Sequence, residues 1–260
     1  MIRILREHWR LSSVTGLAAA AIVGGCLAPP TPITRAEVSA GAQPVALQDI
    51  AGLSAPDVHS PGPRSADFSD PEGEGITRRV TSTASADGRW NVELFRVAPD
   101  GELTAIERVV FRARPPLGDG ERYGTVMLEE VWDFVENRVT RFDPPLEFFP
   151  GELAAGTTHT HETRIAIAGL DDPSDIDQTG SGSIEATFVG VTPIELDGGV
   201  EEALELRSVL RFGIGPARVT RTTESWFLAP PDLHAERSNL KVKVGPLTIK
   251  NEWTASVAMD

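Results

Sequence analysis

Apolar and polar residues alternate one by one near the end of the chain, and this pattern most constrains the fold. In a first segment the apolar residues take every second position, with Ser208 as the one interruption. A later segment repeats the pattern. The apolar positions are Leu204, Leu206, Leu210 and Phe212 in the first segment and Leu247, Ile249, Trp253, Ala255 and Val257 in the later one. Because successive side chains leave a strand on opposite faces, this period of two predicts strands with one buried face.

The same alternation recurs upstream, between breaks rich in proline and glycine. It is clearest over residues 123–135, and Pro99-Asp100-Gly101 is typical of a tight turn between two strands. The stretch 171–182 reads instead as an acidic loop. We therefore predict an all-β fold for residues 76–260, either one large curved antiparallel sheet or a partly open barrel. A sandwich of two sheets is the alternative.

Charge and cysteine content exclude several classes of protein. The formal net charge is −14, which repels nucleic acid, so no nucleic-acid partner is expected. The single cysteine rules out a disulfide within the chain. The sequence holds no glycine-rich phosphate loop followed by a helix, and no cofactor is expected.

The first 25 residues have the parts of a secretion signal. Arg3, Arg6 and Arg10 precede an apolar run, 14–23, that is too short to span a membrane stably. The run ends in Val23-Gly24-Gly25-Cys26, and here the chain resembles a bacterial lipoprotein precursor with its lipobox. The resemblance implies cleavage before Cys26, diacylglycerol on its sulfur, and attachment to the membrane through acyl chains.

Residue 27 is leucine rather than aspartate, which by the same resemblance implies the outer membrane. The protein would then be anchored in the cell envelope and face the periplasm or the exterior. Residues 26–75 are rich in proline without apolar periodicity, so we interpret them as a lipidated tether. The β domain would follow at residue 76.

A second resemblance lies between Gly151 and Leu240. Three stretches carry it: Asp197-Gly198-Gly199 leading into Val200–Leu206, the run Thr223-Glu224-Ser225-Trp226-Phe227-Leu228-Ala229-Pro230, and His234-Ala235-Glu236-Arg237. These are similar to strands of curved antiparallel-sheet envelope proteins of the lipoprotein-carrier half-barrel type and related domains of unknown function. The resemblance implies a concave apolar surface that holds a lipid or peptide, and no catalytic residue.

His159 and His161 are the sharpest candidates for chemistry. Two positions apart on a strand, they share a face and could bind one metal ion, but zinc needs at least a third protein ligand. An exposed polar strand is the simpler explanation, because an isolated pair of histidines is a weak motif. Glu129 and Glu130 are adjacent, so we expect them on opposite faces of their strand and unable to share a substrate.

Two further sets of residues have a functional and a structural interpretation. The tryptophans Trp90, Trp132, Trp226 and Trp253 all fall in predicted strands, where they would line a ligand groove or simply fill the core. Asp171, Asp172, Asp175 and Asp177 crowd one segment, but without a glycine at a sharp turn they are more typical of a solvated loop than of a calcium site.

These observations favour a non-catalytic, lipid-anchored envelope protein whose β domain binds an apolar ligand or an envelope partner. A metal-dependent hydrolase that uses His159 and His161 is one alternative. A purely structural surface protein is another.

Overall fold

The computed structural model describes residues 53–54, 64–69, 78–84, 88–114, 124–196, 199–229 and 232–258. The signal sequence, Cys26 and most of the predicted tether lie outside these ranges. Fourteen strands are described, and all paired neighbours are antiparallel. They are β1 (Leu53–Ser54), β2 (Arg64–Ser69), β3 (Arg78–Ala84), β4 (Arg89–Val97), β5 (Leu103–Ala113), β6 (Val126–Asp133), β7 (Arg138–Phe149), β8 (Glu152–Leu153), β9 (Thr158–Gly169), β10 (Ile176–Leu196), β11 (Gly199–Ile214), β12 (Ala217–Ala229), β13 (Asp232–Val244) and β14 (Leu247–Ala258).

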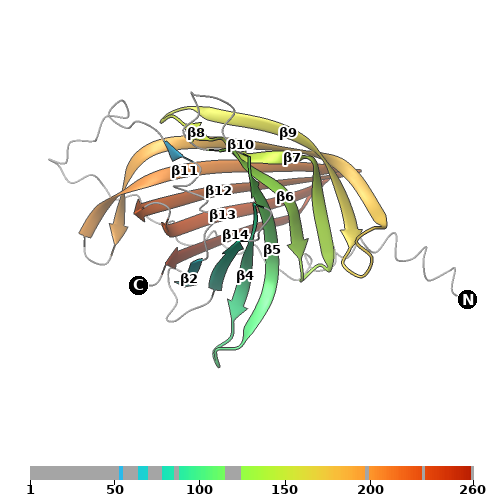
Figure 1. Ribbon diagram of the computed structural model, residues 1–260, viewed down its shortest axis with the longest axis horizontal. Coiled ribbons are helices and arrows are strands. Elements are labelled where there is room, and N and C mark those ends of the chain that lie inside the picture. Colours follow the sequence, from blue (N-terminus) through green and yellow to red (C-terminus); the bar gives the residue numbers. More distant parts are fainter. Residues whose placement is uncertain are drawn as a thin grey trace, which may run out of the picture.

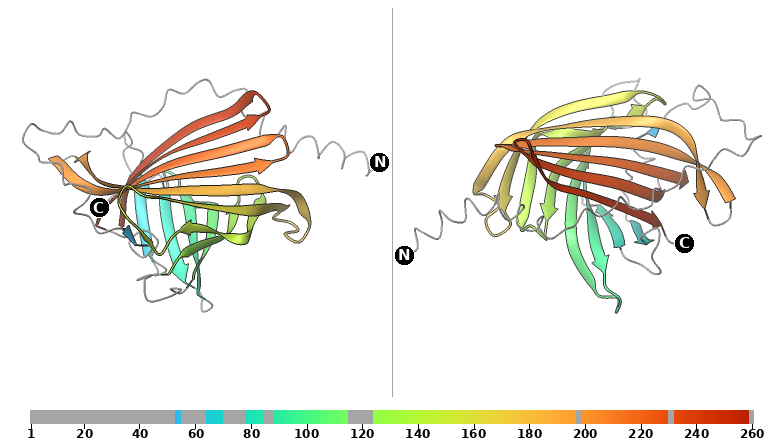
Figure 2. Two further views of the ribbon diagram at one scale, coloured as in Figure 1. Left: turned by 90° about the horizontal axis from the view of Figure 1, so that it is seen from above. Right: turned by 180° about the vertical axis from the view of Figure 1, so that it is seen from behind.

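Twelve of these strands form a single sheet that curls back on itself. The order is β10-β11-β12-β13-β14-β2-β3-β4-β5-β6-β7-β9, and β9 pairs with β10. In Figure 1, β11 to β14 run across the view while β4 and β5 run steeply downward, because the sheet curves strongly between its two halves. Figure 2 shows the resulting curved shell from above and from behind. One curved sheet confirms the all-β prediction, and the sandwich of two sheets is not formed.

The junction between β14 and β2 is the weakest in the sheet. It consists of two residue pairs, Val257 with Ser69 and Ala258 with Phe68, whereas β13 and β14 share ten. The strands thus close on themselves at one short contact, and the architecture is a partly open barrel.

Two stretches differ from the sequence interpretation. Leu53–Ser54 and Arg64–Ser69 lie within the predicted tether but form β1, which pairs with β8, and β2, so the folded region begins before residue 76. The predicted acidic loop 171–182 is also largely strand, because β10 begins at Ile176. Proline and acidic residues concealed β2 and β10, whose backbones are nevertheless paired on neighbouring strands.

The hydrophobic core lies inside the curve of the sheet. It includes Trp90 on β4, Phe111 on β5, Phe149 on β7, Phe188 on β10 and Phe227 on β12, each at most 5% exposed. Strand alternation places these side chains on the concave face, as the period of two requires. The core therefore lies on the concave side of the sheet, and Trp90, Phe111, Phe149 and Phe227 also line the cavity described next.

Candidate ligand cavity

The concave face of the sheet encloses a cavity of about 1260 Å³. This exceeds the roughly 300–1,000 Å³ of typical small-molecule pockets. Every strand of the twelve-strand sheet except β9 contributes residues to its lining. The apolar and aromatic part of the lining is formed by Phe68, Val80, Trp90, Val92, Leu94, Val109, Phe111, Leu128, Val131, Phe142, Phe148, Phe149, Ala186, Leu206, Leu210, Phe212, Val219, Phe227, Leu228, Leu233, Leu240 and Ala258.

Aromatic rings contact one another along one part of the lining. The ring of Trp90 stacks on that of Phe111 with centroids 5.5 Å apart, and Phe111 meets Phe148 at 5.3 Å. Phe142 and Phe212 form a third pair at 5.8 Å. These side chains come from four strands, β4, β5, β7 and β11, so the curvature of the sheet brings them together. They give the cavity a region that favours apolar groups.

The four candidate tryptophans do not gather at one groove. Trp90 lines the cavity and is 1% exposed. Trp226 packs in a separate small cluster with Ile194, Ala203 and Ala235. The remaining two, Trp132 and Trp253, are absent from the cavity lining formed by the described residues.

Both of those remaining tryptophans lie beside arginines. Trp132 donates a hydrogen bond from Nε1 to Glu130 Oε2 at 2.7 Å, and the guanidinium of Arg108 lies over its ring. Trp253 is 38% exposed, with the guanidinium of Arg237 5.9 Å from its ring centroid. Each of these tryptophans forms a cation–π contact with an arginine, and neither side chain lines the cavity.

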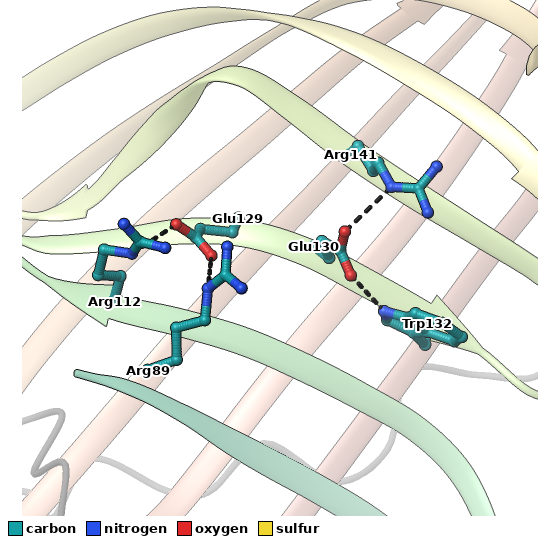
Figure 3. Close-up of polar contacts among 6 residues, drawn as sticks. All are labelled: Arg89, Arg112, Glu129, Glu130, Trp132 and Arg141. Atoms are coloured by element: carbon teal, nitrogen blue, oxygen red, sulfur yellow. Dashed lines mark hydrogen bonds and ion pairs between the residues drawn. The ribbon is translucent and has the colours of Figure 1, made fainter. Parts of the chain in front are cut away.

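Glu129 and Glu130 differ from the expectation drawn from their spacing. Leu128 pairs with Phe111 and Glu130 with Val110, so Glu129 is the extra residue of a β-bulge. Figure 3 shows Glu129 between Arg89 and Arg112, at 2.6 and 2.8 Å, and Glu130 contacting Arg141 at 3.0 Å. The bulge interrupts the alternation, and both carboxylates make ion pairs instead of reaching the cavity.

The two histidines lie together on β9, as their spacing predicts, and both approach Glu147 of β7. Nδ1 of His161 accepts a hydrogen bond from the Glu147 backbone N–H at 3.1 Å. Nε2 of His159 lies 3.5 Å from Glu147 Oε2, and Arg114 contacts the other carboxylate oxygen at 2.8 Å. The backbone pairing of β7 with β9 ends at Asp143. Beyond that point the two histidine side chains contact β7 through Glu147.

Burial is the main influence on the titration of His159. It lowers the pKa of His159 below the ordinary 6.5, and the nearby His161 and Arg114 lower it too, while Glu147 opposes them. The neutral imidazole is thus favoured in the folded protein. Within the described ranges, no group of three or more His, Cys, Asp or Glu side chains is arranged to hold a metal ion.

The acidic segment before β10 is a capped turn. Asp172 Oδ1 accepts hydrogen bonds from the Ser174 backbone N–H at 3.2 Å and from its hydroxyl at 2.6 Å, and these lower the pKa of Asp172. Asp171 accepts a hydrogen bond from Asn137 at 3.4 Å. The aspartates therefore shape the turn locally, which explains their concentration there without a ligand.

The polar part of the cavity lining was not predicted from the sequence. It contains a row of hydroxyls on β11 to β14 and the guanidinium of Arg221. The only signal for it was Ser208, a polar residue at an apolar position of its strand. Alternation shows that Ser208 shares a face with Leu206 and Leu210, but it does not show that this face borders a hollow.

Comparison with known proteins found no family model, curated protein or solved structure that matches this chain. In the part of the chain that the structure describes, no helix has the length and apolar character needed to cross a membrane.

Proposed function

We propose that this protein is a lipid-anchored protein of the cell envelope whose β domain binds an apolar or amphipathic ligand without transforming it. The observation that carries the binding proposal is the cavity of about 1260 Å³ with aromatic rings on its lining. When a ligand with a hydrocarbon chain enters a cavity with apolar walls, the apolar surfaces of the ligand and of the walls are removed from water, which favours binding.

The anchoring proposal rests on the lipobox and on the resemblance to lipoprotein precursors. Acyl chains at Cys26 would hold the protein at the outer membrane, with the β domain facing the periplasm or the exterior. Metabolic labelling with a radioactive fatty acid tests this. We expect label on the wild-type chain and none on Cys26→Ser, and label on neither would contradict the proposal.

Binding is tested with N-phenyl-1-naphthylamine, an uncharged probe that fluoresces in apolar surroundings. The full chain with Cys26→Ser, purified without detergent, is titrated with the probe. We expect saturable binding that a polar substitution at Val109 weakens. Val109 lines the cavity, whereas its neighbour Val110 does not, so Val109→Gln and Val110→Gln form a matched pair.

Thermal melting must first show that both variants fold. Equal probe affinity in the two variants would place the binding site elsewhere than in the cavity. If the folded wild-type domain binds no probe, the result favours the alternative that the protein is purely structural. The alternative of a metal-dependent hydrolase is supported only if zinc copurifies with the chain and is lost in a variant that replaces both His159 and His161.

A further inference from the structure

A row of hydroxyl groups crosses the inner wall of the barrel from β11 to β14. Ser208 pairs with Thr223, Thr223 with Ser238, and Ser238 with Thr254, in direct register. All four line the cavity. Residues that are directly opposite on paired strands point to the same side, so these hydroxyls form one continuous line. We call these four residues the hydroxyl row.

An arginine stands beside the hydroxyl row. Arg221 lies two residues before Thr223 on β12, and its Nε donates a hydrogen bond to Ser238 Oγ at 3.2 Å. It lines the cavity and forms no ion pair with any described carboxylate. A partly buried guanidinium has five N–H donors, so most of those on Arg221 are available to a ligand or to water in the cavity.

Hydrogen-bond acceptors lie on either side of the hydroxyl row. Glu236 is two residues before Ser238 on β13, and Glu252 is two residues before Thr254 on β14. Both line the cavity, and Glu252 also pairs with Lys250 at 2.8 Å. Donors and acceptors thus alternate within a small area of the wall.

A buried hydroxyl on another wall has no partner. Ser82 of β3 is 8% exposed, lines the cavity, and its Oγ has no hydrogen-bond partner among the described residues. A buried polar group without a hydrogen-bond partner destabilises the folded state. Its position on the lining suits an additional polar contact to whatever occupies the cavity.

The charges around the cavity decide which polar group fits best. The carboxylates are more numerous than the guanidiniums, and the chain as a whole carries −14. A head group with a full negative charge would meet this field unfavourably, and a cationic head at the hydroxyl row would lie against the guanidinium of Arg221. Hydroxyl groups both donate and accept, so they match a wall that does the same. The charged lining residues are Arg64, Arg78, Arg221, Asp67, Glu107, Asp133, Glu236 and Glu252.

We propose that the cavity binds an amphiphile with an acyl or alkyl chain and an uncharged head that carries neighbouring hydroxyls, such as a glycerol or a sugar. The chain lies along the aromatic rings around Trp90 and Phe111, and the head contacts the hydroxyl row and Arg221. This inference rests on the proposed apolar-ligand function, and it adds the chemistry of the head.

The test uses ligands that share one dodecyl or lauroyl chain and differ in the head. Monolauroylglycerol, dodecyl glucoside, dodecyl phosphate and dodecylamine displace N-phenyl-1-naphthylamine from the full Cys26→Ser chain, each below its micelle concentration. We expect the two hydroxyl-bearing ligands to bind at least tenfold more tightly than the two charged ones. The ratio between the first two separates a glycerol head from a sugar head.

A pair of matched variants locates the head. In Thr223→Val combined with Ser238→Ala, we expect about a thirtyfold loss of affinity for the hydroxyl-bearing ligands and unchanged affinity for the probe, because two hydrogen bonds to the head are lost. Thr222→Val is the control, since Thr222 is the neighbouring residue and does not line the cavity.

Three outcomes would overturn the inference. Tighter binding of a charged ligand would contradict the head chemistry, and an equal loss in Thr222→Val would contradict its location. An equal loss of probe affinity in the double variant would show that the row supports the whole cavity rather than the head. If the wild-type chain fails to bind the probe at all, the proposed function itself has failed.

Discussion

Gly180 on β10 lies against the backbone of Gly213 on β11, so closely that a Cβ atom on Gly180 would stand 2.0 Å from the Gly213 carbonyl oxygen. The two strands are paired here, with Gly180 opposite Ile214 and Ser181 opposite Gly213. The two strands can approach each other this closely only because Gly180 has no side chain. Gly180 therefore permits the close approach of β10 and β11 at this point.

Replacing Gly180 by alanine is expected to destabilise the fold. The added methyl group would overlap a backbone atom that belongs to a paired strand, and such overpacking costs about 1–3 kcal/mol or more. Chemical denaturation measures the free energy of unfolding. Gly169→Ala is the control, because no atom lies within 4 Å of the corresponding Cβ position. If both variants were equally stable, the close approach would be wrong.

Trp90 and Trp253 are expected to differ strongly in their contribution to stability. Trp90 is 1% exposed and stacks on Phe111, so Trp90→Ala should lower the free energy of unfolding by about 3–5 kcal/mol. Trp253 is 38% exposed, and Trp253→Ala should cost about 1 kcal/mol or less. Denaturation of both variants checks this, and a larger cost at Trp253 would refute the assignment of inner and outer faces.

Glu129 is expected to contribute more than an ordinary surface carboxylate, because it is 11% exposed and holds both Arg89 and Arg112. The two arginines are nearly half exposed, so Glu129→Gln should cost only about 1 kcal/mol. Arg164→Gln should cost nothing measurable, because Arg164 and Asp143 are both well exposed. Repeating the denaturation in about 1 M salt should shrink the Glu129 effect through screening, and an effect independent of salt would count against an ionic origin.

His159 should titrate below 6.5, the ordinary value for histidine, and NMR can follow its imidazole signals against pH. Glu147 is the one group that raises its pKa, so Glu147→Gln should lower the pKa further. Arg114 lowers it, so Arg114→Gln should raise it. Shifts in the opposite directions would mean that the cluster is arranged differently.

The same histidine should make stability depend on pH. Its pKa is lower in the folded than in the unfolded chain, so the unfolded chain binds more protons between the two values. The stability contribution of neutral His159 is present above about pH 6.5, the unfolded value, and is lost as the pH falls toward the folded pKa. Unfolding measured against pH should show a smaller loss in His159→Gln, and an identical profile would rule this contribution out.

The sequence by itself determined the class of fold. Alternating residues such as Leu204, Leu206 and Leu210 predict antiparallel strands, and the structure has them in register on β11. Periodicity is a local property of the chain, so it is readable without knowing the partner strands. It also placed His159 and His161 on one face, which the structure bears out by bringing both to Glu147.

The tertiary structure decided which of those faces border a hollow. Trp226 and Phe227 are adjacent and aromatic, yet only Phe227 lines the cavity. One bulged residue, Glu129, was enough to break the parity of its strand. Long-range pairings, such as that of β14 with β2, bring the two ends of the sheet together, and the resulting curvature decides which side chains meet across the interior. Because these pairings join residues far apart in the chain, a local pattern fixes strands but not the cavity they enclose.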